Sequence, residues 1–184
     1  MFLDNHDMSR FYSVVGEDFN KYKAGMALLL TTRGIPQMYY GDEILMKGND
    51  NPDGLVRSDF PGGWAGDKAN KFTNEGRTDS EKVAFNYVRT LANYRKQTPA
   101  LQTGKLMQYI PEKGIYVYFR YDAAKTIMII YNGETKEQSL STDRFNERKA
   151  GFTGATNVIT HESISNIGSI TIPGKTTLVL ELKK

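Results

Sequence analysis

The spacing of hydrophobic residues changes near Gly104, and this change limits the chain to an architecture with two different halves. Before Gly104, short apolar runs alternate with stretches in which apolar residues recur at helical spacing. After it, residues 115–121 and 126–131 are typical of strands joined by a short turn, and residues 176–182 predict a final strand. We therefore expect an α/β domain over residues 1–103, followed by an all-β domain over residues 104–184 that forms an antiparallel sandwich.

The first half predicts two strand–helix pairs. Residues 2–3 form the end of one strand, and a helix follows from a capping aspartate at position 18 to about position 32. Residues 35–40 predict a second strand, and a Thr-Asp-Ser-Glu capping box opens a second helix over residues 78–97. Residues 45–77 between them form a long loop, which in a compact domain is usually functional or disordered.

Composition excludes several kinds of partner. Lys plus Arg is 24 and Asp plus Glu is 21, with no block of like charges, so nothing demands a nucleic acid or an anionic membrane. The chain has no cysteine, which excludes disulfides and thiol catalysis. Its longest apolar run, Ala24 to Leu30, is far shorter than the ~20 residues that span a bilayer. Met1-Phe2-Leu3 continues directly into a polar cluster, so we expect a fragment rather than a leader peptide.

Two polar clusters follow directly on the predicted strands. Asp4-Asn5-His6-Asp7 follows the first strand, and Gly41-Asp42-Glu43 follows the second. In (β/α) barrels the loops after the strands converge on the barrel axis, and active sites lie there. Both clusters therefore lie where active-site residues are expected, although Asp42 and Glu43, which follow a Tyr-Tyr-Gly strand end, are expected to fix loops.

Three segments in this order resemble regions of the α-amylase family of glycoside hydrolases. Residues 2–7 are similar to the F-x-x-N-H-D region after the seventh barrel strand, and residues 34–43 to the G-I-P-x-x-Y-Y-G-x-E region of the eighth. Residues 91–101 look like the last barrel helix, which leads into the C-terminal β-domain. The resemblance implies a C-terminal fragment: the last two βα units of a TIM (β/α)8 barrel and an antiparallel β-sandwich. The Asp-Phe-Pro-Gly-Gly-Trp loop, residues 59–64, resembles the neopullulanase or cyclomaltodextrinase type.

The resemblance also implies site residues. Asp7 matches the family's third carboxylate, which stabilises the oxocarbenium-like transition state, and His6 matches a histidine that binds the same sugar ring. Asn5, beside them in the motif, is also expected to bind substrate. An acceptor beside a donor suits vicinal hydroxyls, and contacts that tighten as the ring flattens favour the transition state. The alternative for Asp7 and His6 is a role in a turn or a helix cap.

Further sugar contacts are expected from the long loop. Asp53 and Arg57 have the spacing of an Asp and an Arg that bind the next sugar in neopullulanase-like members, although Asp50 competes with Asp53 for that match. The same pair could be a surface ion pair. Arg10 is a candidate for the cleft rim. Trp64 could stack on a glucose ring or pin its own loop.

The two carboxyls that break the bond are expected to be missing. A retaining glycosidase needs a nucleophile and an acid/base about 5–5.5 Å apart, and the family carries them after strands four and five, upstream of Met1. We therefore expect this chain alone to be inactive, and its parent to be a retaining hydrolase of α-1,4-linked glucans, cyclodextrins or pullulan.

Three alternatives remain open. A transglycosidase of the same family differs mainly in how it excludes water. A non-catalytic glycan-binding β-module would explain the second half and Trp64 but not the strand-end motifs. A metal site made from Asp4, His6 and Asp7 ranks last, because alternation along a strand places neighbouring side chains on opposite faces.

The expected partners follow from these inferences. They are α-glucan oligosaccharides, with no nucleic acid, no membrane span and no cofactor or metal; a calcium ion of the parent would lie upstream. Open strand edges and uncovered helix faces predict self-association of the fragment. A periplasmic or secreted location is favoured over a cytoplasmic one, and His161 is expected in a solvated turn.

Overall fold

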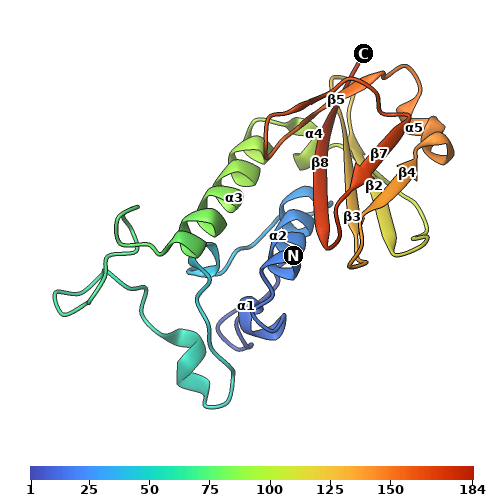
Figure 1. Ribbon diagram of the computed structural model, residues 1–184. Coiled ribbons are helices and arrows are strands. Elements are labelled where there is room, and N and C mark those ends of the chain that lie inside the picture. Colours follow the sequence, from blue (N-terminus) through green and yellow to red (C-terminus); the bar gives the residue numbers. More distant parts are fainter. The chain divides into compact units, whose positions relative to one another are not determined.

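The computed structural model describes residues 1–184 and divides into two compact units (Figure 1). The first unit comprises Met1–Leu29 and Pro36–Arg89, and the second comprises Leu30–Ile35 and Thr90–Lys184. None of the helices is both long and apolar enough to cross a membrane.

The first unit is built from helices and irregular segments. It contains α1 (Phe11–Val14), η1 (Asp42–Ile44) and η2 (Asp53–Arg57), and both α2 (Phe19–Thr31) and α3 (Asp79–Lys96) begin in it. Helix α2 begins at the predicted cap, because Asp18 Oδ1 accepts the N–H groups of Asn20 at 2.9 Å and Lys21 at 3.1 Å. Its buried face carries Tyr22 and Met26, which are fully buried.

The predicted capping box of α3 is also confirmed. The backbone N–H of Thr78 donates to Glu81 Oε2 at 2.7 Å, and the N–H of Glu81 donates to Thr78 Oγ1 at 3.4 Å. These reciprocal bonds satisfy two of the N–H groups that a helix start leaves without partners. Apart from η2, the preceding long loop has no regular helix or strand.

The two parallel strands expected over residues 2–3 and 35–40 are not formed, so this part of the prediction was wrong. The Gln37 N–H donates to the Met1 carbonyl at 2.8 Å, but neither segment belongs to a β-ladder. An extended segment becomes a strand only when successive backbone groups pair with a neighbour. Ile35 is 86% exposed and Phe2 46% exposed, as expected for extended segments without covering neighbours.

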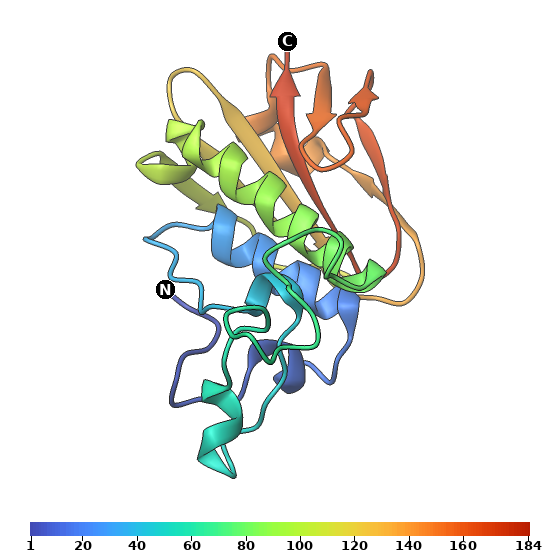
Figure 2. The ribbon, with the colours of Figure 1, turned by 90° about the vertical axis from the view of Figure 1, so that its left-hand side faces the viewer.

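The second unit contains the antiparallel sheet that the sequence predicts after residue 104. A short helix, α4 (Pro99–Gln102), precedes it. The strands form a six-stranded sheet in the order β1-β2-β3-β8-β5-β6 and a two-stranded sheet of β4 and β7, all paired antiparallel. Strand β8, the red arrow in Figure 2, lies between β3 and β5. Their bounds are β1 (Lys105–Gln108), β2 (Ile115–Tyr121), β3 (Thr126–Asn132), β4 (Gln138–Ser141), β5 (Gly154–Asn157), β6 (Ser163–Ile164), β7 (Ser169–Ile172) and β8 (Thr176–Lys183). Between β4 and β5 lie η3 (Asp143–Phe145) and α5 (Asn146–Lys149).

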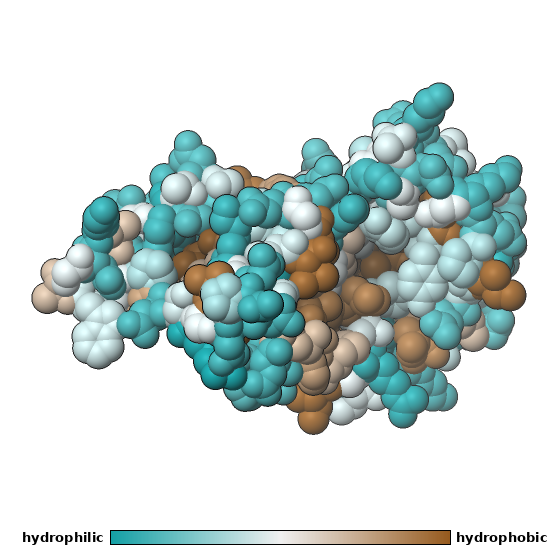
Figure 3. Space-filling model, turned by 90° about the horizontal axis from the view of Figure 1, so that it is seen from below, coloured by the Kyte–Doolittle hydropathy of each residue, from teal (hydrophilic) through white to brown (hydrophobic).

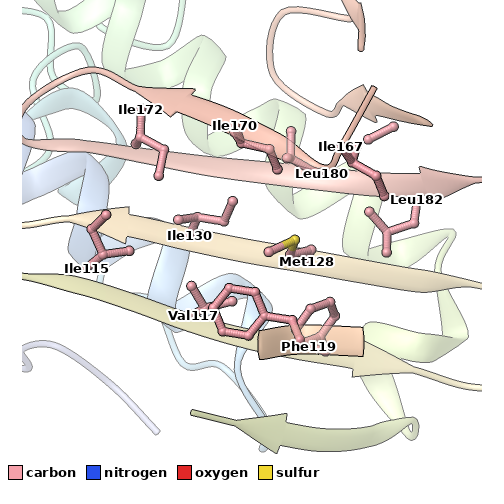
Figure 4. Close-up of a cluster of buried hydrophobic side chains, with 12 residues drawn as sticks. Ile115, Val117, Phe119, Met128, Ile130, Ile167, Ile170, Ile172, Leu180 and Leu182 are labelled. Atoms are coloured by element: carbon pink, nitrogen blue, oxygen red, sulfur yellow. The ribbon is translucent and has the colours of Figure 1, made fainter. Parts of the chain in front are cut away.

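A hydrophobic core joins the two sheets. Figure 4 shows side chains of β2, β3 and β8 beneath those of β7. The labelled members include Phe119, Met128, Leu180, Ile170 and Ile172. The alternate residues of β2 and β3, Tyr118 and Ile129 among them, are also buried. Burial on both faces explains why these strands are nearly continuous apolar runs.

Two buried arginines of the second unit bind the end of helix α2. Arg120 Nη1 donates to the carbonyls of Thr31 at 2.9 Å and Thr32 at 2.6 Å. Arg95 Nη1 donates to the carbonyl of Leu30 at 3.0 Å. The last carbonyls of a helix have no partner within the helix, and they carry the negative end of its dipole, so a guanidinium satisfies both needs.

Several hydrophobic side chains remain at the surface. Figure 3 shows brown, hydrophobic residues among teal ones on the face that it presents. In the first unit, Met1 is 47% exposed and Met38 38% exposed. The expected self-association would occur through exposed apolar side chains such as these, and it stays a prediction.

Candidate functional site

The segment from Asp4 to Phe11 forms a closed turn that presents His6 and Asp7 to solvent. The buried Asp4 accepts the N–H of Phe11 on Oδ2 at 2.6 Å, which joins the two ends of the segment. Within it, Asn5 Oδ1 accepts the N–H of Asp7 at 2.8 Å. The side chains of His6 and Asp7 are 65% and 64% exposed. The backbone is thus fixed while both side chains stay accessible.

Arg57 brings this turn together with η2. Its Nη2 contacts Asp7 Oδ1 at 3.0 Å and its Nη1 contacts Asp53 Oδ2 at 2.8 Å. Its Nε donates to the carbonyl of His6 at 2.9 Å. His6 Nε2 in turn lies 3.3 Å from Asp7 Oδ2. Four of the predicted site residues therefore meet at one place, although about fifty positions separate the two segments.

This group, Asp7, His6, Asp53 and Arg57, is called the Arg57 cluster below. It alternates carboxylate acceptors with guanidinium and imidazole groups that can donate, the pattern that adjacent sugar hydroxyls require. Exposed ion pairs contribute only about 0–1 kcal/mol each, so stability alone gives little reason to gather them. The cluster can bind hydroxyls and stabilise a developing positive charge. It does not contain a nucleophile paired with a separate acid/base.

Arg10 does not lie at a cleft rim, contrary to expectation. Its side chain is fully buried. The guanidinium lies 4.1 Å from the ring centre of Tyr39 and 4.5 Å from that of Tyr40, and Nη1 donates to the Tyr40 carbonyl. Arg10 therefore holds the segment after Gly34 in place through cation–π contacts, which gain strength when desolvated.

Asp42 lies in the same interior as Arg10 and Asp4. Burial raises the pKa of Asp42 to about 8, and the charge of Asp4 and a hydrogen bond to it act in the same direction, whereas Arg10 opposes them. Asp4 Oδ1 and Asp42 Oδ2 are buried without a hydrogen-bond partner. At neutral pH the Asp42 carboxyl is therefore protonated, since burial beside the charge of Asp4 disfavours its ionised form.

Asp42 and Glu43 also take part in hydrogen bonds that involve the backbone of this segment. The Asp42 carbonyl accepts the Tyr22 hydroxyl at 2.8 Å, and Glu43 Oε2 accepts the N–H of Gly41 at 2.9 Å. Gly41 has φ of 87°, a conformation that favours glycine. These contacts are those of residues that fix loops.

Trp64 stands on a loop that other residues hold. Asp67 Oδ2 accepts the N–H groups of Gly62 at 2.6 Å and Trp64 at 3.1 Å, and these bonds lower the pKa of Asp67. The indole itself is 68% exposed. The loop therefore does not depend on burial of the indole, whose face is open to a ligand.

Asp4, His6 and Asp7 do not form a metal site. Asp4 is buried and bonded to Phe11, whereas His6 and Asp7 are exposed. No group of three or more histidines, cysteines or carboxylates lies close enough to hold a metal ion. His161 is exposed and has φ of 64°, as in a turn.

Comparison with known proteins identifies the family. Residues 106–181 match the family model described as Cyclo-malto-dextrinase C-terminal domain. An α-amylase from Niallia circulans is 35% identical over 119 residues, which are 65% of this chain and 19% of that protein. A cyclomaltodextrin glucanotransferase from Geobacillus stearothermophilus is 32% identical over 151 residues, 82% of this chain and 19% of that protein. The chain belongs to the α-amylase family.

Solved α-amylase-family structures agree with this assignment. An Anoxybacillus α-amylase matches the whole chain with a TM-score of 0.78 and 26% identity, over 37% of that protein. The Geobacillus thermoleovorans α-amylase, solved with acarbose, matches with a TM-score of 0.76 and 24% identity, over 38% of its length. The chain thus corresponds to the C-terminal region of an α-amylase-family enzyme and spans well under half the length of these relatives.

Proposed function

We propose that this chain forms part of the substrate cleft of a retaining α-glucan hydrolase. Asp7 is the carboxylate that stabilises the transition state, and His6, Asp53 and Arg57 bind sugar hydroxyls, with Asn5 holding the turn. The observation that carries the proposal is the Arg57 cluster, in which two segments matching family motifs meet through hydrogen bonds of 2.8–3.0 Å. The substrates we infer are α-1,4-linked glucans, cyclodextrins or pullulan, in keeping with α-amylase and glucanotransferase relatives.

The physical role of the cluster follows from its charges. In glycoside hydrolysis the ring becomes oxocarbenium-like, so positive charge grows on the sugar. Asp7, exposed beside Arg57, can face that charge while Arg57 and Asp53 hold the neighbouring hydroxyls. Interactions that strengthen in the transition state accelerate the reaction, whereas equal binding of substrate does not. Arg10 has no place among the substrate contacts, because it is buried.

We further propose that in a longer, neopullulanase-like enzyme residues 1–103 form the last two βα units of the barrel, where residues 2–3 and 35–40 gain the ladder partners that they lack here, and that residues 104–184 form the C-terminal sandwich. The loop of residues 59–64 and the matched C-terminal domain support this subgroup. The chain alone is expected to release no reducing sugar from maltoheptaose, because it lacks the nucleophile and the acid/base that a retaining glycosidase needs. Sustained turnover by the purified chain would contradict this.

Sugar binding at the cluster can be tested through His6. The chain has two histidines, so His6 and His161 each give one Hε1 signal in a proton NMR titration with maltoheptaose. We expect the His6 signal to shift and the His161 signal to stay. Arg57→Met removes charge-assisted hydrogen bonds of about 1.5–3 kcal/mol, so the apparent affinity should fall about 10–100-fold.

The matched control is Asp59→Asn, which neutralises an exposed carboxylate of the same unit outside the cluster. It should bind like the unaltered chain, whereas Asp7→Asn should bind more weakly. An unmoved His6 signal at saturating sugar would refute the proposed site.

A further inference from the structure

A cavity of ≈ 370 Å³ lies within the second unit, away from every family motif noted above. Its walls come from the connection between β1 and β2, from β4 and from the η3 turn. Pockets of about 300–1,000 Å³ are typical of small-molecule sites. Strand pairing fixes the part of the wall that β4 forms, since β4 pairs with β7, and the bridge between Glu112 and Ile115 holds the end of the β1–β2 connection, so these parts need little ordering on binding.

The wall of the cavity includes an aromatic ring held in a fixed orientation. Tyr109 meets Phe145 edge-to-face with ring centres 4.8 Å apart, and Phe119 likewise at 5.9 Å. Tyr109 is only partly buried. Burial raises the pKa of its phenol, which therefore stays neutral. A fixed, neutral and partly exposed ring offers a flat apolar surface for the C–H face of a sugar.

Arg144 and Glu112 of the wall pair with each other, and the exposed Lys113 is the third charged side chain of the wall. Arg144 Nη1 lies 2.7 Å from Glu112 Oε1, and Nη2 donates to the carbonyl of Ile110 at 3.2 Å. The guanidinium lies 6.0 Å from the centre of the Tyr109 ring. A donor fork and a carboxylate acceptor are thus adjacent over an aromatic surface, the same pairing that Arg57 makes with Asp7.

Gln138 adds a held amide to the wall. Its Nε2 donates to the carbonyl of Lys113 at 2.9 Å and to Asn132 Oδ1 at 3.0 Å. An amide nitrogen has two hydrogens, so these bonds use both of them and leave the amide oxygen as an acceptor. Ser139, Ser141 and Lys113 also belong to the polar part of the wall.

These features select a class of ligand. An anion would compete with Glu112 for Arg144, and a purely apolar molecule would leave the amide and hydroxyl groups unpaired, which is costly. A neutral polyol ring has both an apolar face and a rim of hydroxyls, and it can use the donor and the acceptor together. The volume suits about one or two such rings.

We propose that this cavity is a second carbohydrate site, which holds a sugar unit of a neutral α-glucan chain through Tyr109, Glu112 and Arg144. Only the choice of α-glucan among polyols rests on the proposed function. The site is separate from the Arg57 cluster in sequence and belongs to the other compact unit, so it binds whether or not Asp7 contacts sugar.

The test is an NMR titration of the isotope-labelled chain with maltotriose, followed through backbone amides. We expect shifts at residues 109–113 and 138–145 that persist in Asp7→Asn. Ser141→Phe should block the cavity and weaken binding there at least tenfold. Ser163→Phe is the matched control, since Ser163 is exposed on β6 and does not line the cavity, and it should leave the shifts unchanged.

A second variant tests the site in case Ser141→Phe does not fold. Glu112→Ala removes an exposed carboxylate and should weaken maltotriose binding several-fold while the circular dichroism spectrum stays the same. Equal binding by Ser141→Phe and Ser163→Phe, or shifts confined to residues 4–7 and 53–57, would overturn the second site. Stronger shifts at the cavity with inorganic phosphate than with maltotriose would overturn the neutral ligand class. Loss of the His6 response alone would count only against the Arg57 cluster.

Discussion

Replacing Asp42 with asparagine should remove a pH dependence of stability from the first unit. Burial, with the neighbouring Asp4, raises the pKa of Asp42 from an ordinary 3.8 to about 8. Between these values the folded state binds one more proton than the unfolded state, so stability falls as the pH rises. The contribution is fully present below pH 3.8 and is lost as the pH passes through about 8.

The magnitude follows from proton linkage. One proton difference changes the free energy of unfolding by about 1.4 kcal/mol per pH unit, so the unaltered chain should lose about 3 kcal/mol between pH 5 and pH 7. The asparagine amide keeps the shape of the protonated acid and can still donate to Asp4, but it does not ionise. Asp42→Asn should therefore show a nearly flat profile over this range.

The assay is urea unfolding at pH 5, 6 and 7, followed by the fluorescence of Trp64, which lies in the first unit. Hydrogen exchange of residues 1–29 gives an independent measure of the same unit. Asp59→Asn, an exposed counterpart, should keep the slope of the unaltered chain. A slope of the same size in Asp42→Asn, or a stability that rises with pH in the unaltered chain, would refute protonation of Asp42 in the folded state.

Three further predictions concern the second unit, each followed by urea unfolding. Burial opposes ionisation of Glu181, but hydrogen bonds from neighbouring donors lower its pKa to about 2, so stability should fall as the pH drops from 4.5 through 2, and Glu181→Gln should remove this loss. Arg120→Met should cost about 2–5 kcal/mol, because buried helix carbonyls lose their donor, whereas the exposed Arg89→Met should change stability by less than ~0.5 kcal/mol. Phe119→Ala should cost about 3–5 kcal/mol as a core cavity opens, whereas Ile110→Ala, at a side chain 80% exposed, should cost less than ~0.5 kcal/mol.

Local chemistry explains which elements the sequence could predict. The starts of α2 and α3 follow from side chains that bond to N–H groups two or three residues away, so Asp18, Thr78 and Glu81 suffice. Strands β2, β3 and β8 are long apolar runs. Strands β4 and β7 have four residues each, too short for their alternation to stand out. The strands expected over residues 2–3 and 35–40 depend on ladder partners, which a segment's own sequence does not supply.

For the candidate site, too, the sequence predicted some residues and missed others. The family resemblance implied sugar contacts for Asp7 and His6, and for Asp53 and Arg57 either sugar contacts or an ion pair; the structure joins these residues through Arg57. The burial of Arg10 could not be predicted from its position near Asp7 in the sequence. The direction of its side chain depends on contacts with the rings of Tyr39 and Tyr40, about thirty residues further along the chain. Likewise, Tyr109, Glu112 and Arg144 lie in the β1–β2 connection and in η3, and they meet only in the folded chain, so no sequence motif predicted them.

The bonds from Arg95 and Arg120 to the end of α2 set a limit on domain exchange. A chimaera that transplants only residues 104–184 would carry Arg120 without the carbonyls of Thr31 and Thr32, and would leave Arg95 behind. The guanidinium of Arg120 would keep the carbonyls of Gly104 and Lys105 but lose both acceptors of Nη1, and a buried donor without a partner is costly. A graft that respects the hydrogen bonds would take residues 30–35 and 90–184 together, although they are discontinuous in sequence. Evolutionary shuffling of this β-domain would face the same constraint.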